Sequence, residues 1–173
     1  NGIRLIGFGR YAGIVGAYNA FRAFGIKYEL FNLTKAEQLN SQKDLIERLL
    51  RPYLPPIKIV LTGTGKVGMG AKEVLDAMKL KKVSIDQFLN KEFDEPVYVQ
   101  LDVNDYYKRI DGSTGSFADF KANPNEYVSD FQKFANVADV FIAGHFYKDG
   151  SPKILTKEML NGAHNAIKVV ADI

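Results

Sequence analysis

The sequence contains no cysteine, no tryptophan and only two histidines among its 173 residues. Without cysteine the chain has no thiol nucleophile, disulfide or thiolate metal ligand, and two isolated imidazoles disfavour a histidine-based zinc site. Long apolar runs are also lacking, because uncharged stretches such as Tyr11 to Phe21 are far shorter than the roughly 20 residues of a membrane-spanning helix. We therefore expect no metal and no membrane partner.

Charge of one sign is not concentrated along the chain. Lys and Arg number 23 against 20 Asp and Glu, which gives a formal charge of +3. A nucleic-acid-binding domain usually carries a concentrated basic face, so we expect no nucleic-acid partner. No succession of basic, apolar and small residues typical of a signal peptide follows Asn1, and we expect a cytoplasmic protein.

The composition is that of a soluble globular domain, with 46% hydrophobic and 25% charged residues. Both ends resemble core structure: Ile3 to Gly9 is apolar and bounded by glycine, and the final AIKVVADI is rich in β-branched residues. We therefore expect a fragment of a larger protein.

Short apolar segments alternate with segments whose apolar residues have helical spacing. This order predicts an α/β fold, a doubly wound (Rossmann-like) parallel sheet with helices on both faces. The expected strands are Ile57–Thr62, Lys82–Ser84, Val97–Val103, Val137–Ala143 and Ile167–Asp172. The expected helices are Tyr11–Phe24 with Gly25 as its stop, Thr34–Arg51 with Thr34 as its cap, Val67–Leu80, Ser84–Phe93 with a Ser84 and Gln87 capping box, and Thr156–Leu160. Ala118–Phe134 is expected to be polar helix and loop.

The sequence GTGKVG at Gly63 to Gly68 follows a predicted strand and opens a predicted helix, which is the context of a dinucleotide-binding fingerprint. Gly63 permits a tight turn, Gly65 lets the main chain approach a pyrophosphate, and Gly68 permits close packing of helix on sheet. Free N–H groups at the helix start attract phosphate. We therefore expect cofactor contacts from Gly63, Thr64, Gly65, Lys66, Val67 and Gly68.

Two related motifs do not fit. A nucleotide-hydrolase phosphate loop would need glycine at Val60 and a hydroxyl at Val67. The turn of short-chain dehydrogenases would need glycine at Val67, together with a tyrosine followed four residues later by lysine, which no tyrosine here has. The remaining alternative is a glycine-rich turn that binds no nucleotide.

Three blocks resemble the family of lysine-forming saccharopine dehydrogenase and alanine dehydrogenase, specifically its nicotinamide-nucleotide-binding domain. The first is NGIRLIGFGRYAGIVGAYNAFRAFG, with its FGxYAGxxGA core at Phe8 to Ala17. The second is IKIVLTGTGKVGMGAKEVLDAMKL, and the third is ADVFIAGHFYKDGSPKILTKEML together with IKVVADI. They cover roughly half of the chain, and the match is incomplete between Lys81 and Asn136. The resemblance implies a fragment of a two-domain protein, in which residues 1–52 supply a hinge strand and connecting helices and residues 53–173 a dinucleotide-binding Rossmann domain.

The resemblance implies an NAD cofactor whose adenosine ribose is held by an acid. Asp86 has the better spacing from Gly63, and Asp102 at the end of VYVQLD is the alternative. Lysines at 79, 81 and 82 leave NADP open as the cofactor. His145 follows the predicted strand VFIAG at the nicotinamide side, so Gly144, His145 and Phe146 are expected to contact the cofactor.

The same resemblance implies hydride transfer at a carbon bearing nitrogen, in an amino acid or a saccharopine-like amine. Arg4 and Phe8 align with substrate-facing positions, and Arg4 has the planar fork of donors that suits a carboxylate. The family's catalytic lysine and histidine lie on the other domain, so we assign no catalytic residue and expect this chain to bind without turnover. The alternatives are a non-catalytic nucleotide-sensing or interaction domain and a hydrolase or transferase, for which no serine elbow is visible.

Overall fold

The structure is a computed structural model, and it describes residues 7–173. Arg4 and most of the predicted hinge strand lie outside the described residues. The helices are α1 (Gly9–Lys27), α2 (Gln42–Leu49), α3 (Lys66–Ala77), α4 (Ile85–Asn90), α5 (Val103–Tyr106), α6 (Phe117–Ala122), α7 (Gln132–Ala135) and α8 (Lys157–Asn161), with two short 3-10 helices, η1 (Ala36–Gln38) and η2 (Pro124–Glu126). The strands are β1 (Lys58–Thr62), β2 (Lys81–Lys82), β3 (Val97–Leu101), β4 (Tyr107–Arg109), β5 (Tyr127–Ser129), β6 (Val140–Ala143) and β7 (Val169–Asp172).

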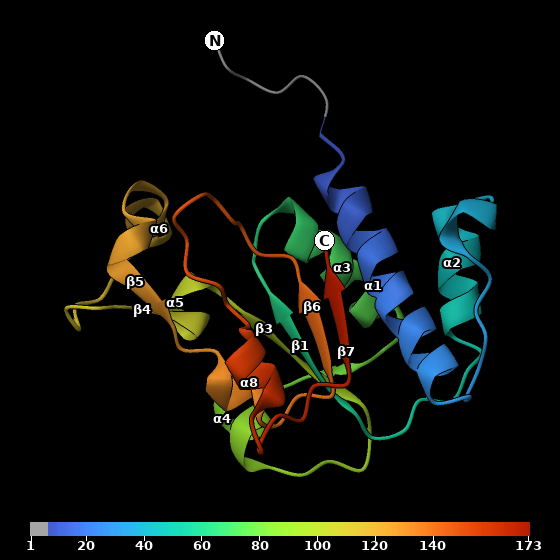
Figure 1. Ribbon diagram of the computed structural model, residues 1–173. Coiled ribbons are helices and arrows are strands. Elements are labelled where there is room, and N and C mark those ends of the chain that lie inside the picture. The colour runs from blue at the N-terminus through green and yellow to red at the C-terminus, as the bar shows by residue number, and fades with distance from the viewer. Residues whose placement is uncertain (1–6) are drawn as a thin grey trace.

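Five strands form a parallel sheet in the order β2-β3-β1-β6-β7. β1 is central, with Thr62 aligned to Leu101 of β3 and to Ala143 of β6. Figure 1 shows α1 and α2 on one side of this sheet, and α4, α5, α6 and α8 on the other. The predicted parallel sheet with helices on both faces is therefore confirmed.

Successive residues of each central strand point alternately into two hydrophobic cores, because side chains of a pleated strand alternate between its two faces. Ile59 and Leu61 of β1 belong to the core beneath α1, α2 and α3, whereas Val60 between them belongs to the core beneath α4 to α7. All three are fully buried. The central strand is thus apolar on both faces, which explains why IKIVLT is a continuous β-branched run.

The long helix α1 packs directly on the fingerprint helix α3, and glycines make this close approach feasible. A Cβ at Gly13 would lie 2.0 Å from the Val67 carbonyl oxygen, and one at Gly70 would lie 1.9 Å from the Arg10 carbonyl oxygen. The prediction that Gly25 stops this helix is wrong, because α1 continues to Lys27. Gly25 is instead needed for packing, since a Cβ there would lie 2.3 Å from the ring of Phe31.

The single helix predicted from Thr34 to Arg51 is replaced by η1 and α2. Thr34 does not cap a helix, because its carbonyl accepts from the Tyr18 hydroxyl at 2.6 Å and its hydroxyl accepts from Arg48 at 3.2 Å. Ser41 is the cap instead, accepting from the backbone N–H of Asp44 at 3.1 Å. Contacts distant in sequence therefore decide where this helix begins.

The segment between β3 and β6 contains a small antiparallel pair, β4 and β5, that the sequence did not predict. Each strand has three residues, too few to display a periodic pattern. Arg109 of β4 holds the unit together through ion pairs with Asp111 at 3.1 Å, Glu126 at 2.6 Å and Asp119. The helix α6 lies between β4 and β5 in the chain, so this unit determines the position of α6 at the edge of the candidate site.

Candidate nucleotide-binding site

The glycine turn lies between the end of β1 and the start of α3, as predicted. Gly63 has a φ of +95°, and a Cβ there would lie 2.4 Å from the carbonyl oxygen of Gly144. A Cβ at Gly68 would lie 2.0 Å from the carbonyl oxygen of Gly63. Gly65 differs, because its φ is −78° and a Cβ there would meet nothing within 4 Å. Gly63 and Gly68 are therefore required by the fold, whereas Gly65 faces open space.

That open space is a cavity of about 640 Å³ at the carboxyl ends of the strands. Eight of the predicted cofactor residues line it, namely Gly63, Thr64, Gly65, Lys66, Val67, Gly144, His145 and Phe146. Gly68 lies directly beneath this wall, since a Cβ on Gly144 would be 3.2 Å from the Cα of Gly68. Two loops that are about 80 residues apart in the sequence thus form one wall.

The structure brings Asp102 to the glycine turn and does not bring Asp86 there. β2 follows β1 in the sequence but lies at the outer edge of the sheet, and β3 occupies the place beside β1. Asp86 is in the first turn of α4, which Figure 1 shows beside the opposite end of the sheet, and its carboxylate accepts from Asn90 at 2.9 Å. Asp102 lines the cavity.

The carboxylate of Asp102 is fixed at the start of α5. Its Oδ1 accepts from the backbone N–H of Val103 at 2.7 Å and lies 3.5 Å from the Thr64 hydroxyl. Its own backbone N–H donates to Asp105 Oδ2 at 2.7 Å, which completes a reciprocal cap. An oriented, exposed carboxylate at this position can accept hydrogen bonds from a pair of sugar hydroxyls.

His145 is the imidazole nearest to the glycine turn, and its ring forms a hydrogen bond with the buried hydroxyl of Thr62. Its Nδ1 lies 2.8 Å from Oγ1 of Thr62, the last residue of β1. Burial lowers the pKa of His145 below its ordinary value, and the negative charge of Asp172 opposes this shift only in part. The side chain is therefore a neutral imidazole at pH 7, with one nitrogen engaged by Thr62 and the other available as a polar group.

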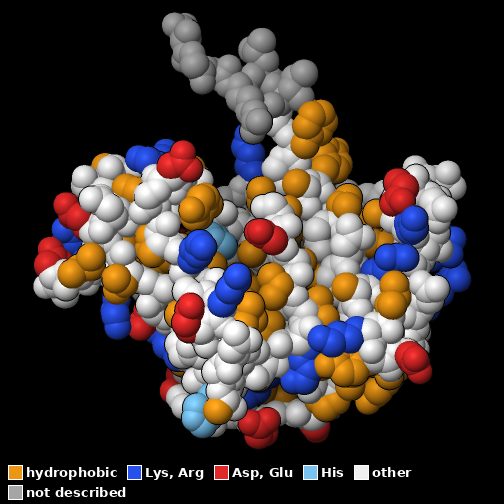
Figure 2. All heavy atoms as spheres, viewed as in Figure 1, with side chains coloured by type: hydrophobic (Ala, Val, Ile, Leu, Met, Phe, Trp, Pro, Cys, Tyr) orange, Lys and Arg blue, Asp and Glu red, His pale blue; other side chains and the backbone are white. Residues whose placement is uncertain are grey.

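His145 also borders a second cavity of about 560 Å³ beside β6, β7 and α8. Tyr147 lines both cavities, and Lys153 and Asp172 place opposite charges on the wall of the second. In Figure 2, which shows this side of the molecule, Lys and Arg side chains are interspersed with Asp and Glu. The two cavities thus meet at His145 and Tyr147.

Of the two predicted substrate residues, Arg4 lies outside the described residues and Phe8 is described, so their joint role stays a prediction. Phe8 immediately precedes α1 and is 69% exposed, and it does not line the cavity at the glycine turn. Arg10, which stands where the resemblance leads us to expect an aromatic residue, pairs with Glu73 of α3, with Nε 2.7 Å from Oε1. Arg10 thus links α1 to α3.

Three aromatic residues of the cavity wall were not predicted as site residues: Tyr106, Phe117 and Tyr147. A local pattern could have indicated Tyr106, because Asp102 and Asp105 have the spacing of a helix cap directly after a strand. Phe117 follows Ser116, whose spacing to Asp119 is also that of a helix cap, but its place at the cavity depends on the β4–β5 unit.

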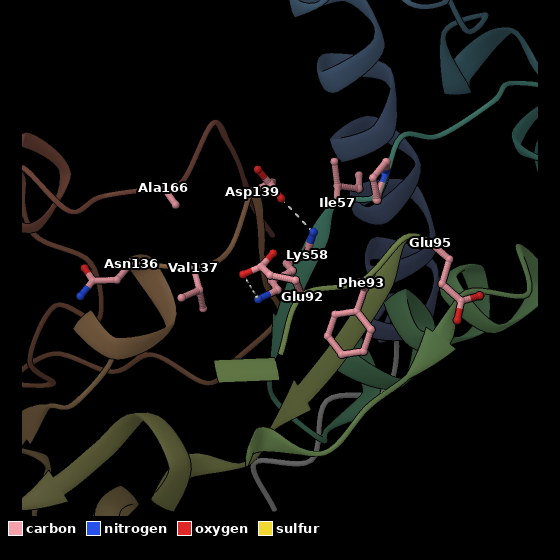
Figure 3. A pocket seen from close by; sticks show the side chains of 10 residues that line it. Ile57, Lys58, Glu92, Phe93, Glu95, Asn136, Val137, Asp139 and Ala166 are labelled. Atoms are coloured by element: carbon pink, nitrogen blue, oxygen red, sulfur yellow. Dashed lines mark hydrogen bonds and ion pairs between the residues drawn. The ribbon is translucent and has the colours of Figure 1, made fainter. Parts of the chain in front are cut away.

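A different cavity, of about 360 Å³, lies at the amino ends of β1 and β6, away from the glycine turn (Figure 3). The backbone N–H of Lys58 donates to Asp139 Oδ2 at 2.9 Å, and its side chain pairs with Glu92 at 3.6 Å. The first bond joins the starts of β1 and β6, and the second joins β1 to the segment between α4 and β3, so we assign this cavity a structural role.

No protein-family model matches the sequence. The chain is 22% identical over 186 residues to a protein of Bos taurus named alpha-aminoadipic semialdehyde synthase, mitochondrial, and 23% identical over 186 residues to the protein of that name from Rattus norvegicus. The protein of that name from Mus musculus is 21% identical over 180 residues. Each alignment covers 91% of this chain and 19% of the relative.

The chain thus spans about a fifth of the length of the curated relatives it matches. Their names place them in mitochondria, and the cytoplasmic location stays a prediction. Within residues 7–173, no helix has the length and apolar character needed to cross a membrane. The chain is a Rossmann-like α/β domain with distant similarity to alpha-aminoadipic semialdehyde synthases.

Proposed function

We propose that this chain is the NAD-binding domain of an amino-acid-type dehydrogenase resembling saccharopine dehydrogenase, acting in hydride transfer at a carbon–nitrogen bond. The observation that carries the proposal is the difference among the three fingerprint glycines. Gly63 and Gly68 are pressed against backbone, whereas Gly65 faces an open cavity in a conformation that any residue adopts. Packing therefore does not account for a glycine at this position, while the close approach of a pyrophosphate does.

The surroundings of the turn suit the other parts of a dinucleotide. The start of the 12-residue helix α3 and the side chain of Lys66 favour phosphate charge. Asp102 offers a carboxylate to the hydroxyls of the adenosine ribose, and the same negative charge would repel the 2′-phosphate of NADP. We therefore propose Asp102 as the ribose acid and NAD as the preferred cofactor.

The loop after β6 suits the nicotinamide half of the dinucleotide. Gly144 and His145 follow β6, on the side of the sheet where a doubly wound fold receives the second half of the dinucleotide. The bound cofactor supplies the hydride acceptor or donor, and the neutral imidazole of His145 offers it a hydrogen-bonding group. The relatives' name contains an amino-acid semialdehyde, which fits an oxidoreductase of lysine metabolism.

The test is calorimetric titration of this chain with NADH and NADPH, alongside Gly65→Val. The added side chain meets no protein atom, so the variant should fold like the parent and lose NADH binding. Gly7→Val is the matched control, because a Cβ at Gly7 also meets nothing within 4 Å and Gly7 does not line the cavity. This control should bind NADH as the parent does.

Unchanged NADH binding by a folded Gly65→Val variant would refute the proposed pyrophosphate position. Tighter binding of NADPH than of NADH would refute the role proposed for Asp102. Absence of binding of both nucleotides by the folded parent chain would contradict the proposed function of the domain.

A further inference from the structure

Thr62, the last residue of β1, is a fully buried polar residue in an otherwise apolar part of the strand. It lies two residues after Val60, so both side chains point to the same face of the sheet, where Val60 belongs to the core beneath α4 to α7. Valine has nearly the same shape as threonine and would fill this place without a hydroxyl. Packing therefore does not explain the hydroxyl of Thr62, and its hydrogen bond has to explain it.

The partner of this hydroxyl is the imidazole of His145, whose ring is held by several neighbours. Oγ1 of Thr62 lies 2.8 Å from Nδ1 of His145. The carbonyl of Thr62 accepts from the backbone N–H of Gly144 at 3.1 Å, which fixes the backbone next to the imidazole. The ring of Phe141 is nearly parallel to the imidazole, with centroids 6.4 Å apart, and the ring of Tyr106 is 5.7 Å away. These contacts hold the imidazole in one orientation.

The direction of the Thr62–His145 hydrogen bond decides which nitrogen carries the imidazole proton. A neutral imidazole has one N–H donor and one acceptor nitrogen, and a hydroxyl has a single proton to donate. Within residues 7–173, Oγ1 of Thr62 has no hydrogen-bond partner besides Nδ1. If Nδ1 were the donor, the hydroxyl proton would be buried without an acceptor, which is costly. The hydroxyl therefore donates to Nδ1, and the imidazole proton lies on Nε2.

With the proton on Nε2, neither nitrogen of His145 presents a free lone pair to a ligand. The lone pair of Nδ1 accepts from Thr62. Nε2 has no protein partner in the described part of the chain, and His145 lines both cavities. Burial lowers the pKa of His145, which keeps the ring neutral at pH 7. The imidazole can therefore donate a hydrogen bond from Nε2, but it cannot take a proton from a ligand.

We propose that Thr62 is a positioning residue that makes His145 a hydrogen-bond donor, through Nε2–H, to an acceptor oxygen of the bound ligand. The identity of that ligand rests on the proposed function. The carboxamide of the cofactor and the carboxylate of an amino-acid substrate both offer such an oxygen. An ammonium group has no acceptor and is therefore disfavoured at this nitrogen.

The position of the proton can be observed directly, because the chain has only two histidines. His164 is exposed, so His164→Gln leaves His145 as the sole imidazole without disturbing the core. In ¹⁵N NMR spectra at neutral pH, a protonated ring nitrogen resonates well apart from an unprotonated one. We expect a protonated Nε2 and an unprotonated Nδ1 in His145. A protonated Nδ1 would overturn the proposal.

Two substitutions of Thr62 separate positioning from packing. Thr62→Val keeps the branched shape and removes the hydroxyl, so the Nδ1 signal of His145 should lose the shift that the hydrogen bond causes. Thr62→Ser keeps the hydroxyl and should restore the signal of the parent. A folded Thr62→Val variant with the parent's Nδ1 signal would overturn the role of Thr62. If Thr62→Val does not fold, the spectrum of the parent still decides where the proton lies.

Ligand titrations test His145 as a donor. NADH alone should move the Nε2 signal if the cofactor supplies the oxygen, whereas saccharopine added to the NADH-bound chain should move it if the substrate does. His145→Gln retains an N–H donor and should keep the affinity for that ligand within about twofold. His145→Leu has no donor and should weaken binding of the same ligand about tenfold. Circular dichroism verifies that each variant folds.

The outcomes separate this inference from the proposed function. If NADH binds and neither addition moves the Nε2 signal, the donor role is overturned while the proposed function is upheld. If the folded parent binds neither ligand, the proposed function fails and the donor role fails with it. The position of the imidazole proton, measured without ligand, then still decides whether Thr62 determines the protonation of His145.

Discussion

Replacing Gly13 with alanine tests the contact that positions the fingerprint helix. The added Cβ would lie 2.0 Å from the carbonyl oxygen of Val67, 2.7 Å from the backbone nitrogen of Ala71 and 2.9 Å from the carbonyl carbon of Val67. All three are backbone atoms, so no side-chain rotation relieves the overlap, and α1 must move away from α3. Overpacking of this kind costs about 1–3 kcal/mol, and we place this case at the upper end.

The same substitution has an opposing effect that makes the sign informative. Alanine in a helix interior is favoured over glycine by about 1 kcal/mol. The net expectation is a loss of about 2 kcal/mol in the free energy of unfolding, or roughly 4–8 °C in Tm for a domain of this size. If α1 and α3 did not touch at Gly13, the variant would instead be more stable than the parent.

Urea denaturation followed by circular dichroism measures this change, with an unchanged m value showing that the unfolding reaction is the same. Asn19→Ala is the matched control, because Asn19 is an exposed position of the same helix. It should gain a few tenths of a kcal/mol from helix propensity alone. A Gly13→Ala variant as stable as this control would refute the close helix contact.

Three further outcomes are expected. Asp102→Asn retains a good helix cap but loses the negative charge. It should weaken NADH binding about tenfold and reduce the preference for NADH over NADPH. An unchanged preference in calorimetric titrations would contradict the assignment of Asp102 as the ribose-binding acid. Burial lowers the pKa of His145 in the folded state, so the unfolded state binds more protons as the pH falls below about 6.5, and the free energy of unfolding should decrease as the pH is lowered from there. His145→Gln should remove that part of the decrease in urea denaturation at each pH, and identical pH profiles would argue against a buried neutral imidazole. Ser84→Ala removes the cap of α4, in which the hydroxyl accepts from the Gln87 N–H at 3.2 Å; it should cost about 1 kcal/mol in thermal unfolding, and no change in Tm would show that the cap contributes nothing.

The parts of the fold that local chemistry determines could be predicted from the sequence. The central strand was evident because burial on both faces requires a continuous apolar run, and the capping box at Ser84 and Gln87 is present as expected. The glycine turn was evident because its requirements fall within six residues. These features depend on neighbours in the chain, which a sequence displays directly.

The features that could not be predicted depend on which segments meet in space. Asp86 has the expected separation from Gly63, but the order of strands in the sheet differs from their order in the chain, and this places Asp102 at the turn. Thr34 has the residues of a good cap, but Tyr18 and Arg48 bind its carbonyl and hydroxyl. In both cases the local pattern was present and a tertiary contact determined the outcome.

The outer edge of the sheet has a consequence for how the protein behaves in a crowded solution. β2 is only two residues long, both of them exposed lysines, and the Nζ of Lys81 is 2.7 Å from the Glu95 carboxylate. A long, apolar edge strand offers unpaired backbone groups to other chains, whereas a short edge carrying lysines does not. By placing its shortest and most charged strand outermost, the fold protects this side of the molecule against edge-to-edge aggregation.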